Sequence, residues 1–249
     1  MWVLLHGFSG SPASWDEVVE LMNPEDPPLR PTLTGHGPEG SAACGPSFDE
    51  ELSRLTHEIS QSSRPRLLAG YSMGARVALG LLATRPALFD AAVLVGVHPG
   101  LTDEAARAER RAIDGARARQ LRTEGIRSFV DSWEQQPLFE TQQKLSSDVL
   151  EKQRTLRLGH DPEGLARAIE VLGLARMPDY GSELVQTPIP IILMAGSLDS
   201  KFADIARSFA LRSRHLRARI IEGAGHNLLI EAPGDVASTL IDLETEVAR

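Results

Sequence analysis

Short strand-like runs, most of them rich in apolar residues, alternate along the chain with segments in which apolar residues recur every three or four positions. The strand-like runs cover 2–5, 29–33, 66–70, 91–95, 189–195 and 218–221. Helical spacing covers 48–62, 73–84, 203–211 and 236–247. Buried parallel strands are apolar on both faces and are joined by helices, so this alternation predicts an α/β fold with a mostly parallel sheet flanked by helices.

The alternation stops between about 101 and 184. No strand-like run occurs there, and arginine becomes frequent, at Arg107, Arg110, Arg111, Arg117, Arg119, Arg122 and Arg127. We interpret residues 101–184 as a helical cap inserted into one core domain formed by 1–100 and 185–249. A chain of 249 residues is a common size for a single α/β domain with an insertion.

Composition narrows the class of protein. Hydrophobic residues make up 42% and charged residues 24%, which excludes a disordered chain. A net charge of −8 disfavours nucleic-acid partners, and no apolar run approaches the ~18 residues that a membrane span needs. The apolar start is too short for a signal peptide, and the single cysteine, Cys44, excludes an internal disulfide. We expect a cytoplasmic monomer or small homo-oligomer.

The sharpest local signal is Gly70-Tyr71-Ser72-Met73-Gly74, which follows an apolar run and precedes a helical segment. This G-x-S-x-G context is that of a nucleophile elbow, a sharp strand-to-helix turn that exposes the serine hydroxyl. The glycines give the backbone room at such a turn. The alternative is a plain Gly/Ser turn. We predict Ser72 as a catalytic residue.

A catalytic serine needs an imidazole, and the imidazole needs an orienting carboxylate. Asp199 and His226 each follow a strand-like run through a glycine-containing turn, where open α/β sheets place their sites. Asp199 has the alternative role of a helix cap, with Asp204 as a nearby rival. The other histidines fall in helical or cap-like stretches (His57, His160 and His215) or precede Gly or Pro at turns (His6, His36 and His98).

Two further features concern the substrate. An oxyanion hole needs two backbone N–H groups, and we predict those of Met73 and of Phe8 in the loop after Leu5. Arg76 lies four residues after Ser72 and therefore on the same helix face, which favours a small carboxylate-bearing substrate. No metal-ligand cluster, phosphate loop or dinucleotide fingerprint occurs, so we predict neither metal nor cofactor.

These residues resemble the α/β-hydrolase fold and, more narrowly, the family of 2-succinyl-6-hydroxy-2,4-cyclohexadiene-1-carboxylate synthases of menaquinone and phylloquinone biosynthesis. The wider resemblance rests on Leu5-His6-Gly7-Phe8-Ser9-Gly10, Gly35-His36-Gly37, 70–74, Asp199 and His226. The narrower one rests on Gly70-Tyr71-Ser72-Met73-Gly74-Ala75-Arg76, His98-Pro99-Gly100-Leu101, Trp133-Glu134-Gln135-Gln136-Pro137-Leu138-Phe139 and Gly196-Ser197-Leu198-Asp199-Ser200-Lys201-Phe202. The last two stretches are the most specific, and the resemblance spans nearly the whole chain.

The resemblance implies a lyase that removes a ring proton and expels pyruvate, with no acyl-enzyme. It implies carboxylate recognition by Arg76, Arg110 and Arg157, with Arg154 as a rival to Arg157. It also implies a pocket lined by Tyr71, Trp133 and Lys201. A serine carboxylesterase or C–C bond hydrolase of the same fold, and a non-catalytic binding module, are the alternatives.

One departure concerns the N-terminal strands. Members of this family usually have a strand or two before the Leu-Leu-His-Gly stretch, whereas this chain starts at Met1-Trp2-Val3. Either that first hairpin is missing from the sheet, or the start of the chain is assigned too late. A missing hairpin affects stability or assembly more than chemistry.

Overall fold

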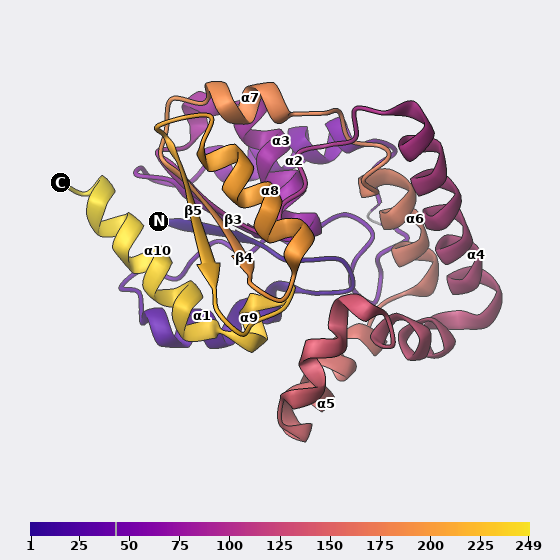
Figure 1. Ribbon diagram of the computed structural model, residues 1–249. Helices are drawn as coiled ribbons and strands as arrows, with labels where there is room; N and C mark the ends of the chain where they lie inside the picture. Colours follow the sequence, from indigo (N-terminus) through magenta and orange to yellow (C-terminus); the bar gives the residue numbers. More distant parts are fainter. Residues whose placement is uncertain (43) are drawn as a thin grey trace.

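A computed structural model describes residues 1–42 and 44–249. Its centre is a sheet of five parallel strands, which confirms the predicted α/β class (Figure 1). Their order across the sheet follows the chain: β1 (Trp2–Leu5), β2 (Leu67–Tyr71), β3 (Ala91–Val95), β4 (Ile191–Gly196) and β5 (Leu216–Ile221). The carboxyl ends of all five strands therefore meet at one edge of the sheet.

Helices cover both faces of the sheet, and the strand residues alternate between two hydrophobic clusters. In β2, Leu68 packs with the helices of one face, whereas Leu67 and Ala69 pack with those of the other. The first face is covered by α2 (Phe48–Ser60), α3 (Met73–Thr84) and α8 (Ser200–Ala210). The second is covered by α1 (Asp16–Met22), α9 (Leu228–Glu231) and α10 (Pro233–Val247). Short 3₁₀ turns lie at η1 (Pro12–Trp15) and η2 (Pro86–Leu88).

The apolar run at 29–33 does not form the strand that its composition predicts. Leu29 alone pairs with β1, where its N–H donates to the Trp2 carbonyl at 2.9 Å and its carbonyl accepts from the Leu4 N–H at 2.9 Å. Pro28 and Pro31 flank the bridge and have no N–H to donate. The pairing therefore stays a single bridge.

Only helices occur in the described residues between β3 and β4. They are α4 (Glu104–Glu134), which bends at Gly125, η3 (Pro137–Lys144), α5 (Ser147–Leu158), α6 (Pro162–Leu172) and α7 (Gly181–Gln186). α4 and α6 pack together through a small apolar cluster of their own, and with α5 they stand to one side of the sheet (Figure 1).

Unlike α4 and α6, the short helix α7 packs against the sheet domain, because its Leu184 belongs to the same hydrophobic cluster as the residues of α3. The predicted boundary between 184 and 185 thus falls inside α7. The division into core and cap stays a prediction. None of the helices in the described part of the chain has the length and apolar character that crossing a membrane requires.

Candidate active site

Ser72 occupies the turn between β2 and α3 in a conformation that side chains rarely adopt, with φ 52° and ψ −107°. Its N–H donates to the Val95 carbonyl at 2.8 Å, and its carbonyl accepts from the Arg76 N–H at 3.1 Å. These two bonds hold the strained turn between sheet and helix. Strain of this kind collects at functional sites, where the surrounding structure enforces it.

The flanking glycines are required by close backbone approach. A Cβ on Gly74 would lie 2.3 Å from the Leu5 carbonyl oxygen, and one on Gly70 would lie 2.4 Å from the Gly74 carbonyl oxygen. No side chain fits at such distances, so the turn can form only with glycine at both positions. This is the local reason why the sequence folds into an elbow here.

His226 and Asp199 reach Ser72 from the loops after β5 and β4. The His226 Nδ1–H donates to Asp199 Oδ2 at 2.6 Å, and His226 Nε2 lies 3.0 Å from Ser72 Oγ. Both side chains are buried. With the Nδ1 proton held by the carboxylate, Nε2 is free to accept the serine hydroxyl proton. Gly96 makes room, since a Cβ there would stand 2.9 Å from His226 Cε1.

The rival assignments from the sequence do not reach Ser72. Asp199 begins α8 but makes no side-chain capping bond, because its carboxylate is turned to His226. Asp204 is exposed on α8, where its Oδ1 pairs with Arg207 at 3.3 Å. Among the described residues, only His226 is hydrogen-bonded to the Ser72 hydroxyl.

Phe8 and Met73 border the same cavity as Ser72. Within the described chain, neither backbone N–H has a hydrogen-bond acceptor. The Phe8 ring packs edge-on against Trp133, with centroids 5.2 Å apart, and against Phe129 at 6.0 Å. Two unoccupied donors beside a serine hydroxyl are suited to hold an oxygen on which negative charge develops.

The cavity in front of Ser72 has a volume of about 250 Å³ and an excess of positive charge. Its wall includes Arg76, Arg110, Arg117 and Lys201 but only one acid, Asp114. Burial, with the charge of Arg110 adding, lowers the pKa of Arg76 to about 9, and Asp114 opposes that shift. The described wall of the cavity therefore has more cationic side chains than carboxylates to pair with them.

Asp114 organises two of these cations. Arg110 Nε donates to both carboxylate oxygens, at 2.8 and 2.9 Å, and Arg117 lies 3.7 Å from Oδ1 on the other side. The Arg117 guanidinium also lies over the Trp133 ring at 4.9 Å. Lys201 also lines the cavity, with its Nζ 5.7 Å from the centroid of the Phe202 ring.

Arg157 does not border this cavity. It donates to Glu134 at 2.9 Å and lies 5.1 Å from the centroid of the Phe139 ring, in a neighbouring cavity of about 90 Å³. Tyr71, Trp133, Phe139 and Phe8 form the wall shared by the two cavities. Arg154, the alternative to Arg157, borders neither of these two cavities. It is partly exposed and pairs with Asp131 and Glu134.

The residues of the cavity wall that sequence reasoning missed include His98, Arg117 and Asp114. His98 Nδ1 accepts the Gly100 N–H at 3.2 Å, and burial, reinforced by Lys201, Arg76 and Arg110, lowers its pKa to about 4. Its position directly after β3, at the carboxyl edge of the sheet, is a signal that could have found it. Arg117 follows Arg110 by two helical turns, which is also a readable signal.

No group of three histidine, cysteine or acidic side chains in the described ranges is arranged to hold a metal ion. The chemistry available is that of a hydroxyl activated by an imidazole and a carboxylate, next to two free N–H donors and several cations. Such a site can move protons and stabilise negative charge.

Comparison with known proteins agrees with this geometry. Residues 2–239 match the alpha/beta hydrolase family. The 2-succinyl-6-hydroxy-2,4-cyclohexadiene-1-carboxylate synthase of Enterobacter sp. (strain 638) is 33% identical over 97% of this chain and 90% of its own. The enzyme of that name from Salmonella schwarzengrund (strain CVM19633) is 34% identical, over 97% and 92%. The chain belongs to this synthase family.

Solved structures agree with that assignment. The structure of MenH from S. aureus superposes with a TM-score of 0.91 at 29% identity, covering 100% of this chain and 94% of that one. A thermophilic esterase from Thermogutta terrifontis reaches 0.81 at 22% identity, covering 99% and 89%, and shows the shared fold alone. The family and the α/β-hydrolase fold that the motifs predict are therefore confirmed.

Proposed function

We propose that the protein is a lyase of menaquinone biosynthesis that converts 2-succinyl-5-enolpyruvyl-6-hydroxy-3-cyclohexene-1-carboxylate to 2-succinyl-6-hydroxy-2,4-cyclohexadiene-1-carboxylate with release of pyruvate. One observation carries the proposal: the Ser72–His226–Asp199 hydrogen-bonded line opens into a cavity with four cationic side chains and one acid. The substrate bears three carboxylates, so its charge matches that cavity. The names of the relatives support the same reaction.

The reaction begins with loss of the ring proton next to the succinyl ketone. In our proposal, Ser72 Oγ takes this proton while the serine proton passes to His226 Nε2, and Asp199 stabilises the imidazolium that forms. The electron pair of the broken C–H bond is first held as the enolate of the succinyl ketone. As the ketone carbonyl re-forms, this pair makes a new ring double bond and the existing double bond shifts by one position. The C–O bond to the enolpyruvyl group then breaks, and His226 returns its proton to the departing enolate, which becomes pyruvate.

Backbone donors and cations stabilise the charge that develops. The N–H groups of Phe8 and Met73 hold the enolate oxygen of the succinyl ketone, or one carboxylate in its place. Arg76 binds a carboxylate, since its buried guanidinium has only a backbone carbonyl and a thioether as partners among the described residues. Arg110 and Lys201, which line the same cavity, bind further carboxylates in this proposal.

Tyr71 and Trp133 form the apolar wall beside the ring of the substrate in this proposal. Arg157 approaches the substrate from behind Phe139, on the side of the smaller cavity. Its guanidinium is buried and, among the described residues, pairs with Glu134, so in this proposal Phe139 moves aside to let a carboxylate of the substrate reach it. Arg154 has no such access, because two acids already hold it.

The decisive experiment offers the enolpyruvyl substrate to the purified protein and follows pyruvate. We expect rapid release by the wild type and loss of release in Ser72→Ala. Absence of release above background contradicts the lyase. A burst with p-nitrophenyl acetate together with an acyl group trapped on Ser72 indicates a hydrolase instead, whereas unchanged function in Ser72→Ala indicates a binding module.

A further inference from the structure

Two buried histidines outside the proposed triad exchange hydrogen bonds between two loops. His6 lies directly after β1, and His36 lies in the loop that follows the Leu29 bridge. His6 Nε2 accepts the Leu33 N–H at 3.1 Å, and His36 Nε2 accepts the Ser9 N–H at 3.2 Å. Each imidazole thus satisfies a backbone donor from the other histidine's loop, and we call this pair the histidine clasp.

The remaining ring nitrogens fix the protonation of the clasp. His6 Nδ1–H donates to the Gly7 carbonyl at 2.8 Å. His36 Nδ1–H donates to the carbonyls of Leu33 and Thr34, at 3.2 and 3.1 Å. Both rings are therefore neutral, with the proton on Nδ1 and the lone pair on Nε2. The rings also pack edge-to-face, with centroids 4.8 Å apart.

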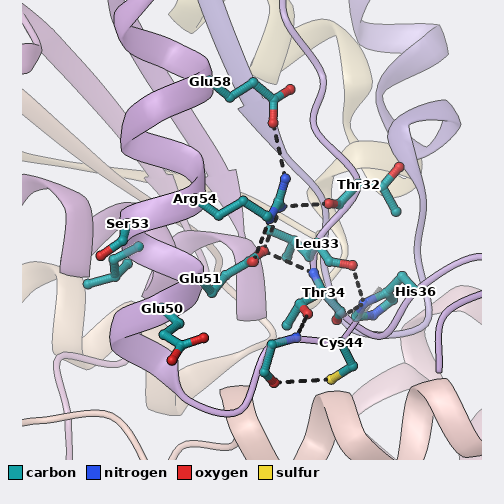
Figure 2. A network of polar contacts seen from close by, with 12 residues as sticks. Thr32, Leu33, Thr34, His36, Cys44, Glu50, Glu51, Ser53, Arg54 and Glu58 are labelled. Carbon is teal, nitrogen blue, oxygen red and sulfur yellow. Dashed lines mark hydrogen bonds and ion pairs between the residues drawn. The ribbon is translucent and has the colours of Figure 1, made fainter. Parts of the chain in front are cut away.

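The clasp is itself held from two sides. Glu51, buried in α2, accepts the Thr34 N–H at 2.9 Å, and Arg54 donates to Glu51 and to the Thr32 carbonyl (Figure 2). On the other side, His160 lies between α5 and α6, and its Nδ1 accepts the Gly37 N–H at 2.8 Å. His36 therefore stands on a loop that is fixed by the core and by the inserted helices.

The clasp holds the segment that carries the Phe8 N–H. Ser9, which donates its N–H to His36, has a φ of 55°. A non-glycine residue keeps this conformation only when its surroundings enforce it. The Phe8 ring packs edge-on against the His36 ring, with centroids 5.8 Å apart. Loss of the bond to Ser9 would release this strained turn and leave a buried donor unsatisfied.

We propose that His6 and His36 are positioning residues, which aim the Phe8 N–H at the developing oxyanion. Each does so as a neutral imidazole that accepts a backbone N–H from the loop of the other. The inference rests on the proposed function, because it gives the Phe8 N–H a role in the reaction. Neither histidine touches the substrate. Catalysis by backbone donors depends on their placement to within fractions of an ångström, so a loosened turn lowers the rate more than the affinity.

The test compares three variants of His36. His36→Phe keeps a ring but removes the acceptor, His36→Gln keeps an acceptor near the position of Nε2, and His36→Asn places its oxygen too short to reach Ser9. Leu33→Ala is the matched control, because it empties a fully buried site in the same loop without touching an acceptor. For each protein we measure kcat and KM for pyruvate release, and exchange of the Ser9 amide by NMR without substrate.

We expect His36→Phe to lower kcat by roughly 10- to 100-fold with KM changed by less than about threefold. His36→Gln should recover most of that loss, and Leu33→Ala should lose stability but keep its kcat. Protection of the Ser9 amide should fall in His36→Phe and persist in His36→Gln and Leu33→Ala. Equal kcat values for the Phe and Gln variants, or an equal kcat loss in the control, overturn the inference.

Two further outcomes stay decisive. If His36→Phe does not fold, His36→Gln and His36→Asn are compared, and equal kcat and equal Ser9 protection in these two variants overturn the inference. If the wild type releases no pyruvate, the lyase proposal fails by itself. Ser9 protection then still decides whether His36 holds the Phe8 turn.

Discussion

The guanidinium of Arg76 donates to the backbone carbonyl of Leu172 at 2.6 Å and so joins α3 of the sheet layer to the end of α6. The side chain is buried, and no carboxylate among the described residues lies within ion-pair distance of it. A buried cation with only a carbonyl as a strong partner is incompletely stabilised. An anion entering the cavity beside Ser72 would complete its surroundings.

Replacing Arg76 should therefore impair the reaction with the tricarboxylate substrate. Loss of a buried arginine–carboxylate contact costs roughly 2–5 kcal/mol, so we expect Arg76→Ala to lower kcat/KM by about 30- to 5000-fold. Steady-state kinetics of pyruvate release measure the effect. Arg85→Ala, at the exposed end of the same helix, is the control and should stay near wild type. A change below about twofold in Arg76→Ala shows that it does not bind the substrate.

The second prediction concerns the proton on His226. In Asp199→Asn an amide NH₂ can face Nδ1, which forces the proton onto Nε2 and leaves no acceptor for the Ser72 hydroxyl. We expect kcat to fall by roughly 100- to 10,000-fold with little loss of stability. Asp204→Asn, on the exposed face of α8, should leave kcat unchanged. Similar kinetics in the two variants argue against a role for Asp199.

The elbow and its partners could be predicted because their signals are local. The spacing of Gly70, Ser72 and Gly74 between a strand-like run and a helical segment is a local signal of the elbow, although the close approach that requires Gly74 is made by the Leu5 carbonyl of β1. Asp199 and His226 are distant in sequence, yet each follows a strand of a parallel sheet. Parallel strands end at one edge, so the topology brings them together.

The inserted helices could be predicted as helices but not in their packing. Helical periodicity gives the face on which Arg157 lies, but not the cavity that this face meets, because Arg157 packs on Phe139 from another segment and borders the neighbouring cavity. The single bridge at Leu29, by contrast, has a readable cause, because Pro28 and Pro31 stand in the sequence and cannot donate to a ladder. The cavity that Arg157 meets depends on tertiary contacts that a sequence pattern does not encode.

The third prediction tests the close backbone approach at the elbow. Gly74→Ala would place a Cβ 2.3 Å from the Leu5 carbonyl oxygen, where neither backbone can move without disrupting β1 or α3. We expect a loss of several kcal/mol in unfolding free energy, measured by urea denaturation. Gly115→Ala is the control, since its nearest neighbour is a flexible arginine end at 3.6 Å. Alanine in the α4 interior should stabilise by up to about 1 kcal/mol.

The last prediction follows from the neutral rings of the histidine clasp. Burial lowers the pKa of His6 from 6.5 to about 4, and burial together with its neighbours His6 and His160 lowers that of His36 well below its ordinary value. Above pH 6.5 these rings are neutral in both the folded and the unfolded chain. Between pH 6.5 and about 4 the unfolded chain takes up protons that the folded chain refuses, so stability falls as the pH falls.

His6 alone should account for a loss of about 3 kcal/mol across that interval, with no further loss from it below pH 4. Asp161 and Glu170, whose pKa values hydrogen bonds lower, add to the slope only from their ordinary range downward, whereas His98 and His160, whose pKa values burial lowers, contribute in the same interval as the clasp. Urea midpoints measured from pH 7.5 to 4.5 give the curve, and NMR titration of His6 gives the pKa directly. A His6 ring that titrates near 6.5 in the folded protein would show that the clasp tolerates charge, and the acceptor geometry at Leu33 and Ser9 would then need another explanation.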